Sequence, residues 1–121
     1  MKKTICFSML ILLFFSGCGN SFSMIDYSDV EKIIIRTHQS EREASEDEAS
    51  SIIELYNASK YGGKATGEGG TPDFGARIVL KNGNEIRVND FYGKVEVFAP
   101  NKAFYLESQE LYEMIKEAAS A

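Results

Sequence analysis

The dipeptide Asn82-Gly83 stands between two runs of residues in which apolar and polar side chains alternate, Ala76 to Leu80 and Glu85 to Phe91. Asn-Gly is the dipeptide best suited to the positive φ angles of a tight hairpin turn. The two runs are therefore predicted to be paired antiparallel strands. A fold that accommodates this chain must contain an antiparallel sheet.

Further strands are predicted on both sides of this hairpin. The β-branched run Ile33-Ile34-Ile35 indicates a largely buried strand over Val30 to Thr37. After a turn at Tyr92-Gly93, Lys94 to Ala99 forms another strand, and Ala103 to Glu107 forms a short last one. Short connections between successive strands favour an antiparallel meander.

Two amphipathic helices are predicted, one before the hairpin and one at the end of the chain. The run Ser45-Glu46-Asp47-Glu48 matches the capping box that opens a helix, here over residues 46–60, and Gly62-Gly63 supplies its stop. Ser108 caps a second helix from Gln109 to about Ala119. The apolar stripes consist of Ala49, Ile52, Ile53 and Tyr56 in the first helix, and of Leu111, Ile115 and Ala118 in the second.

These elements predict an α+β fold, a two-layer sandwich in the order β-α-β-β-β-β-α. Since each helix has one apolar stripe, both should pack on one face of an antiparallel sheet of about four to five strands. The other face should stay partly wet, because polar residues alternate with the apolar ones. We expect a partner to bind there, at Arg77, Arg87 and the outward-facing Phe98.

Residues 62–73 contain five glycines and no bulky apolar side chain, so the sequence predicts a mobile loop. The order of Gly, Lys and Thr differs from that of a phosphate-binding loop, which also leads from a strand into a helix. The loop is either a flexible connector or a binding loop that closes over a partner with Gly67, Gly69 and Gly70.

The sequence gives little support for catalysis, for a metal centre or for a cofactor. The acidic cluster within residues 41–48 lacks the spacing and the glycine of a calcium-binding EF-hand loop, and first-turn carboxylates are explained by the helix dipole. His38 is the only histidine, and no serine lies in a nucleophile elbow. Asp73 and Asp90 form a carboxylate pair only if the fold brings them together. We therefore expect a non-enzymatic domain without a metal or cofactor.

The N-terminus has the pattern of an export signal. Lys2 and Lys3 precede an apolar run from Ile5 to Phe15, followed by Ser16-Gly17-Cys18. As a helix, eleven residues span about 16 Å, roughly half of the ~30 Å hydrocarbon core, so a permanent transmembrane helix is not expected.

The segment Phe15-Ser16-Gly17-Cys18 resembles the lipobox of bacterial lipoproteins, although Phe15 stands where Leu, Val or Ile is usual. The resemblance implies removal of residues 1–17 by cleavage between Gly17 and Cys18, and attachment of a diacylglycerol or acyl lipid to the Cys18 sulfur. Residues 18–28 would then be a lipidated tether, and residues 29–121 a single α+β domain. The lipid would hold the protein on the extracytoplasmic face of the cell membrane.

The exported part would have no thiol other than Cys18, since the second cysteine, Cys6, lies in the signal. It would carry eleven basic and eighteen acidic residues, a formal charge of −7, which argues against nucleic acid as a partner.

The whole layout is similar to that of small lipoproteins of unknown function in Gram-positive, Bacillus-like bacteria. That likeness implies a membrane-anchored interaction module for a protein or cell-wall partner. The alternative is a lipoprotein that binds a small ligand or cation through the acidic and glycine-rich loops.

Overall fold

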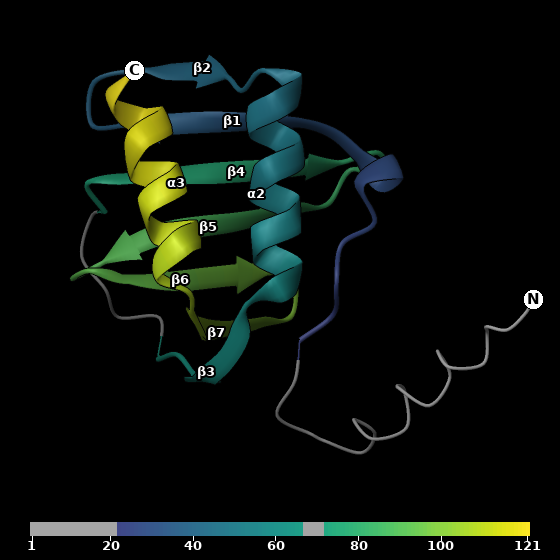
Figure 1. The fold of residues 1–121 in the computed structure, drawn as a ribbon. Coiled ribbons are helices and arrows are strands. Elements are labelled where there is room, and N and C mark those ends of the chain that lie inside the picture. The colour runs from purple at the N-terminus through teal and green to yellow at the C-terminus, as the bar shows by residue number, and fades with distance from the viewer. Residues whose placement is uncertain (1–21, 67–71) are drawn as a thin grey trace, which may run out of the picture.

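A computed structural model describes residues 22–66 and 72–121. Seven strands form one antiparallel sheet in the order β2-β1-β4-β5-β6-β7-β3, and two helices lie across one of its faces (Figure 1). The helices are α2 (Glu46–Ala58) and α3 (Gln109–Ser120), and a 3-10 turn, η1, covers Tyr27–Asp29. The strands are β1 (Val30–Thr37), β2 (Glu41–Glu43), β3 (Lys60–Lys64), β4 (Phe74–Leu80), β5 (Glu85–Phe91), β6 (Lys94–Ala99) and β7 (Lys102–Glu107).

The α+β class, the antiparallel sheet and the placement of both helices on one face are confirmed. The core lies between the sheet and the helices, and the predicted apolar stripes of both helices are buried in it. Ser45 and Glu48 form the predicted capping box, and Ser108 caps α3 by accepting from the amide of Leu111. Neither helix in the described ranges has the length and apolar run required to cross a membrane.

The predicted number of strands was wrong, and so was their order along the chain. The sheet has seven strands instead of four to five, because β2 and β3 lie in segments without a strand pattern. β2 is only three residues long, and it forms a hairpin with β1 through the pairs Ile34–Glu43 and Arg36–Glu41. Its three residues are all charged and lie within an acidic run, so the sequence has no alternation there that would indicate a strand.

β3 occupies the place where the helix stop and the start of the loop were predicted. The helix ends at Ala58, before Gly62-Gly63, and the extended Ser59 leads into a strand that pairs with β7. At Gly62, an added Cβ would lie 3.2 Å from the carbonyl oxygen of Tyr105. The glycine therefore allows close approach of two strands instead of ending a helix.

Of the two predicted hairpin turns, the one at Tyr92-Gly93 is confirmed and the one at Asn82-Gly83 differs from expectation. The β4–β5 hairpin is confirmed, but four residues, 81–84, connect its strands, and only Gly83 among them has a positive φ, 97°. The tight two-residue turn is Tyr92-Gly93, where φ is 51° and 84°. Turns of this kind normally use Asn, Asp or Gly in the first position.

Residues 22–28 are the described part of the expected tether, and they lie against the domain. The backbone N–H of Ile25 donates to Asn57 Oδ1 at 2.8 Å, and Asn57 Nδ2 donates back to the Ile25 carbonyl at 2.8 Å. The Phe22 ring stacks on Phe104 and meets Tyr56 edge-on, with centroids 5.6 and 5.4 Å apart. We call the contacts of Phe22 and Ile25 the N-terminal clamp.

Arg42 on β2 joins three elements of the fold. Its guanidinium donates two hydrogen bonds to the Glu48 carboxylate, at 2.9 and 2.8 Å, and a third to the Ala118 carbonyl at the end of α3. Glu48 also accepts from the backbone N–H of Ser45. These contacts lower the pKa of Glu48 to about 2, and the hydrogen bonds from Arg42 have the largest effect.

We expect the Glu48–Arg42 pair to make stability depend on pH. Because the pKa of Glu48 is lower in the folded chain, its contribution is complete above its ordinary value of 4.5 and disappears as pH falls towards about 2. Since the Arg42 side chain is 38% exposed, water screens the pair, and we expect it to contribute about 1 kcal/mol. Urea unfolding at pH 7 and at low pH should show a smaller difference for Glu48→Gln than for wild type. Equal differences would contradict this, and Glu46→Gln in the same turn is the control.

Candidate functional site

The sheet face opposite the helices, which we call the open face, carries three of the six predicted partner-binding residues, Arg77, Arg87 and Phe98, in one row. The register pairs Arg77 on β4 with Arg87 on β5, and Arg87 with Phe98 on β6. Ile34 on β1 continues the row beside Arg77. Residues that are ten or eleven positions apart in sequence are thus direct neighbours, and we call Arg77, Arg87 and Phe98 the arginine row.

The two arginines of this row differ in their contacts. Arg77 Nη1 donates to Glu85 Oε2 at 3.1 Å, and its Nη2 lies 3.6 Å from Glu41 Oε1. Arg87 is exposed, and it makes no ion pair within the described residues. The open face therefore presents one arginine held in place by two carboxylates and one whose guanidinium faces water.

A second row on the open face is more buried than its polar sequence suggests. It runs through Arg36, Gly75, Asn89, Glu96 and Tyr105, each paired with the next across five strands. Arg36 Nη2 donates to Asn89 Oδ1 at 3.1 Å. A side chain at Gly75 would collide with that same oxygen, so the glycine leaves room for the Asn89 amide.

Glu96 is the unusual member of this row. It is only 3% exposed, and its Oε2 has no hydrogen-bond partner within the described residues. Burial raises the pKa of its carboxyl group. The rings of Phe91 and Tyr105, from the strands on either side of β6, approach to 5.6 Å between centroids. The expectation of a partly wet face was therefore wrong at Glu96, which is buried between its neighbours in register, Asn89 and Tyr105.

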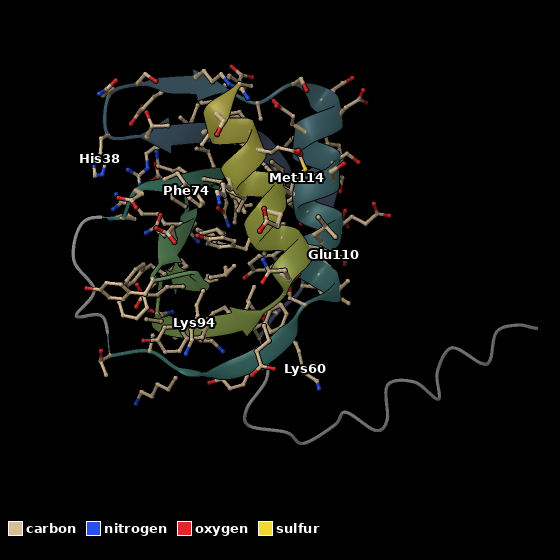
Figure 2. The ribbon with its side chains drawn as sticks, turned by 60° about the vertical axis from the view of Figure 1, so that its left-hand side comes forward. His38, Lys60, Phe74, Lys94, Glu110 and Met114 are labelled. Carbon is tan, nitrogen blue, oxygen red and sulfur yellow. The ribbon has the colours of Figure 1, made fainter. Side chains whose placement is uncertain are left out.

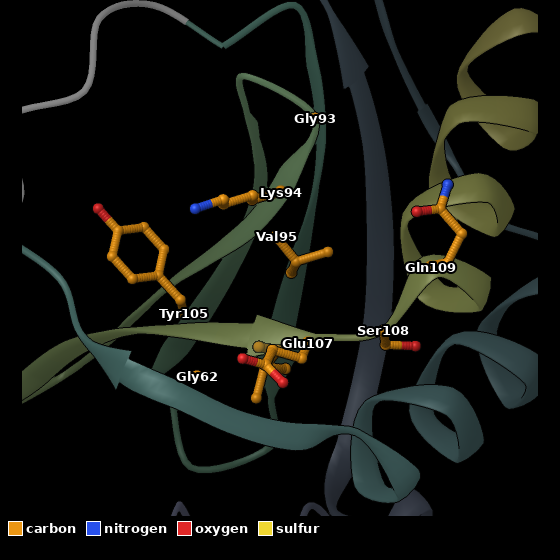
Figure 3. Close-up of a pocket in the computed structure, with 9 residues that line it drawn as sticks. Gly62, Gly93, Lys94, Val95, Tyr105, Glu107, Ser108 and Gln109 are labelled. Atoms are coloured by element: carbon orange, nitrogen blue, oxygen red, sulfur yellow. The ribbon is translucent and has the colours of Figure 1, made fainter.

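A hollow of about 340 Å³ lies where β6 and β7 meet the start of α3, and we call it the edge hollow. Lys94 and Tyr105 stand on one side of it, Gln109 on the other, and Glu107 between them (Figure 3). Val95 and Leu106 provide its apolar lining. The edge hollow combines an ammonium, a carboxylate, an amide and a phenol.

A smaller hollow of about 210 Å³ lies on the other side of the β5–β6 turn, and we call it the turn hollow. Asp73, Asp90 and Tyr112 line it, so the fold does bring the two aspartates to one place. Burial, and secondly a hydrogen bond with Asp90, raises the pKa of Tyr112. His38, at the turn after β1 (Figure 2), lies with Nε2 3.1 Å from Asp73 Oδ1.

Tyr92 lines the turn hollow and precedes Gly93, which lines both hollows. It is 85% exposed, the highest value among the large hydrophobic residues that the structure describes. Its φ of 51° is the left-handed conformation, which costs an ordinary L-residue about 1–2 kcal/mol. Its ring contacts Phe91 edge-on at 4.8 Å between centroids.

Several predicted positions lie outside the described residues: Gly17, Cys18, Gly67, Gly69 and Gly70. Over residues 22–66 and 72–121, no group of three or more His, Cys, Asp or Glu side chains is arranged to hold a metal ion. In the acidic cluster of residues 41–48, the Glu48 carboxylate forms an ion pair with Arg42.

Sequence reasoning missed Glu96 and Tyr92 as candidate site residues. The alternation placed Glu96 on the polar face, but no local pattern reveals its burial. The Tyr92-Gly93 turn was predicted, and an aromatic residue where Asn or Asp is usual was the available signal for Tyr92. Comparison of the chain with protein-family models, with curated proteins and with solved structures found no match.

Proposed function

We propose that this chain is a non-enzymatic binding module, held by a lipid on Cys18 at the extracytoplasmic face of the cell membrane, which recognises a protein or cell-wall partner through its open face. The observation that carries the proposal is the arginine row. Arg77, Arg87 and Phe98 form a contiguous patch of the residue types that are enriched in interfaces.

The contacts of the arginine row support rapid and specific recognition. Arg77 is already held by Glu41 and Glu85, so less side-chain entropy is lost when it meets a partner. Arg87 is exposed and supplies a guanidinium for hydrogen bonds to carboxylate, phosphate or carbonyl oxygens.

The distribution of charge favours the open face over the helix layer as the binding surface. The two helices together carry seven acidic residues and a single basic one, Lys116 (Glu110 on α3 is labelled in Figure 2). The open face carries the basic groups Arg36, Arg77, Arg87 and Lys94 together with the carboxylates Glu41, Glu43, Glu85 and Glu96, so its charges are mixed. An anionic envelope component would be repelled by the helix layer, whereas the open face offers it Arg87, which makes no ion pair within the described residues.

The N-terminal clamp supports close tethering. Phe22, which lies against the domain, is only four positions after Cys18, and four extended residues reach about 14 Å. A lipid on Cys18 would therefore keep the domain next to the membrane surface.

Photo-crosslinking in intact cells tests the proposed surface. A crosslinker at Ile34, beside the arginine row, should give a specific adduct with the wild-type lipidated chain. Arg87→Glu should reduce its yield about tenfold or more, as expected for an interface arginine. Lys116→Glu makes the same change in charge on the helix layer and should leave the yield unchanged.

Two outcomes would overturn the proposal. One is the absence of any specific adduct from the open face, and the other is an equal loss of adduct in the Arg87 and Lys116 variants. The second result would show that net charge, and not the arginine row, determines association.

A further inference from the structure

We propose that the β5–β6 turn is a saccharide-binding site, in which Tyr92 stacks on a pyranose ring and the edge and turn hollows bind its hydroxyl groups. The site does not use the arginine row, so a test of this site is independent of a test of the proposed partner surface.

The first observation is the position of Tyr92. An 85% exposed aromatic ring at the tip of a hairpin contributes little to the core, and its backbone is held in the left-handed conformation. Asn, Asp or Gly would fit this turn with less strain, and strained residues of this kind concentrate at ligand sites. The ring presents a flat apolar surface to the solvent, which is what the C–H face of a sugar ring requires.

The second observation is the pair of hollows beside that ring. Tyr92 lines the turn hollow, and Gly93, the next residue, lines both hollows. The edge hollow, at about 340 Å³, falls within the range of small-ligand sites, roughly 300–1,000 Å³. Two sugar units of one chain could therefore flank the turn.

The third observation is the mixture of donors and acceptors. Lys94 supplies hydrogen-bond donors, and the carboxylates Glu107, Asp73 and Asp90 supply acceptors. The amide group of Gln109 has both a donor and an acceptor. Sugar hydroxyls both donate and accept hydrogen bonds, so they match such a set. Three carboxylates against one ammonium disfavour a phosphorylated ligand, and the described residues contain no metal-holding group.

The aromatic lining extends the stacking surface beyond Tyr92. Phe91 contacts Tyr92 at 4.8 Å and Tyr105 at 5.6 Å between ring centroids, and Tyr105 itself lines the edge hollow. The three rings form a continuous series from the tip of the turn to the edge hollow. A linear oligosaccharide would lie along it.

The test is a titration of the full-length protein, in micelles of a detergent without a sugar headgroup, followed by amide NMR shifts. The probes are the tetramer of N-acetylglucosamine and cellotetraose. We expect at least one of them to shift the amide signals of Tyr92, Gly93 and Lys94. Tyr92→Phe should bind within about threefold of wild type, because stacking does not require the hydroxyl group.

The decisive variant is Tyr92→Asn, which separates binding from folding. Asparagine accepts a positive φ more readily than tyrosine, so this variant should melt a few degrees higher while its affinity falls at least about tenfold. Tyr27→Asn replaces another exposed tyrosine, far from the turn, and should bind like wild type.

The proposal is overturned if neither oligosaccharide shifts the turn signals, or if Tyr92→Asn binds as well as wild type. Shifts centred on Arg87 instead of Tyr92 would also overturn it, while leaving the arginine row as the partner surface. Loss of crosslinking in Arg87→Glu together with normal sugar binding would support both proposals, as two separate sites.

Discussion

Replacing Cys18 with serine is expected to move nearly all of the protein from the membrane fraction to the medium. The proposed lipid is joined through a thioether, and the serine hydroxyl cannot take its place. Two or more acyl chains give stable anchoring at about 0.8 kcal/mol per buried methylene, so the loss should be close to complete. Cell fractionation followed by immunoblotting measures it.

Cys6→Ser is the matched control for the anchor, because it removes the other cysteine of the chain and leaves the lipobox-like segment intact. Its product should stay in the membrane fraction. Mass spectrometry of the N-terminal peptide should find the mass of a diacylglycerol on Cys18 in the control and not in Cys18→Ser. Persistence of Cys18→Ser in the membrane would refute the lipoprotein hypothesis.

Replacing Phe104 with alanine is expected to lower the free energy of unfolding by about 3–5 kcal/mol. Phe104 is 1% exposed on the helix side of β7 and contacts the rings of Phe22 and Tyr61. The free energy of unfolding of a small domain is only about 5–15 kcal/mol, so this single change should remove a large part of it.

Phe98→Ala is the matched control, since it removes the same ring from the open face of β6. Phe98 is half-buried, so we expect a loss of no more than about 1.5 kcal/mol. Guanidinium unfolding followed by circular dichroism compares the two variants. Equal losses would contradict the assignment of Phe104 to the core and of Phe98 to the open face.

The difference between these two phenylalanines was predictable from period-two alternation, because Phe98 is out of phase with Val95 and Val97, which are buried. Alternation needs only the local sequence and a knowledge of which face is covered. The same logic gave the bounds of β1, β5 and β6 and the capping box of α2, all of which depend on residues a few positions apart.

The strands that escaped prediction depend on distant partners. β3 has glycines in its centre, and it becomes a strand because its backbone pairs with β7, more than forty residues away. β2 is fixed by the guanidinium of Arg42, which reaches from the sheet edge to both helices. Likewise, the candidate site required the register, since nothing local indicates that Arg77 adjoins Arg87, or that Asp73 and Asp90 share a hollow.

The N-terminal clamp also defines how force would pass through an anchored molecule. In the proposed membrane-bound form, a pull on a partner would be resisted at Phe22 and Ile25, where the chain meets Asn57 and the ring of Phe104. The described N-terminal segment and the β5–β6 turn lie at opposite sides of the sheet (Figure 1). Tension between membrane and ligand would therefore run through the whole domain, and the ring contacts of Phe22, nearest to the anchor, would bear it before the two hydrogen bonds of Asn57.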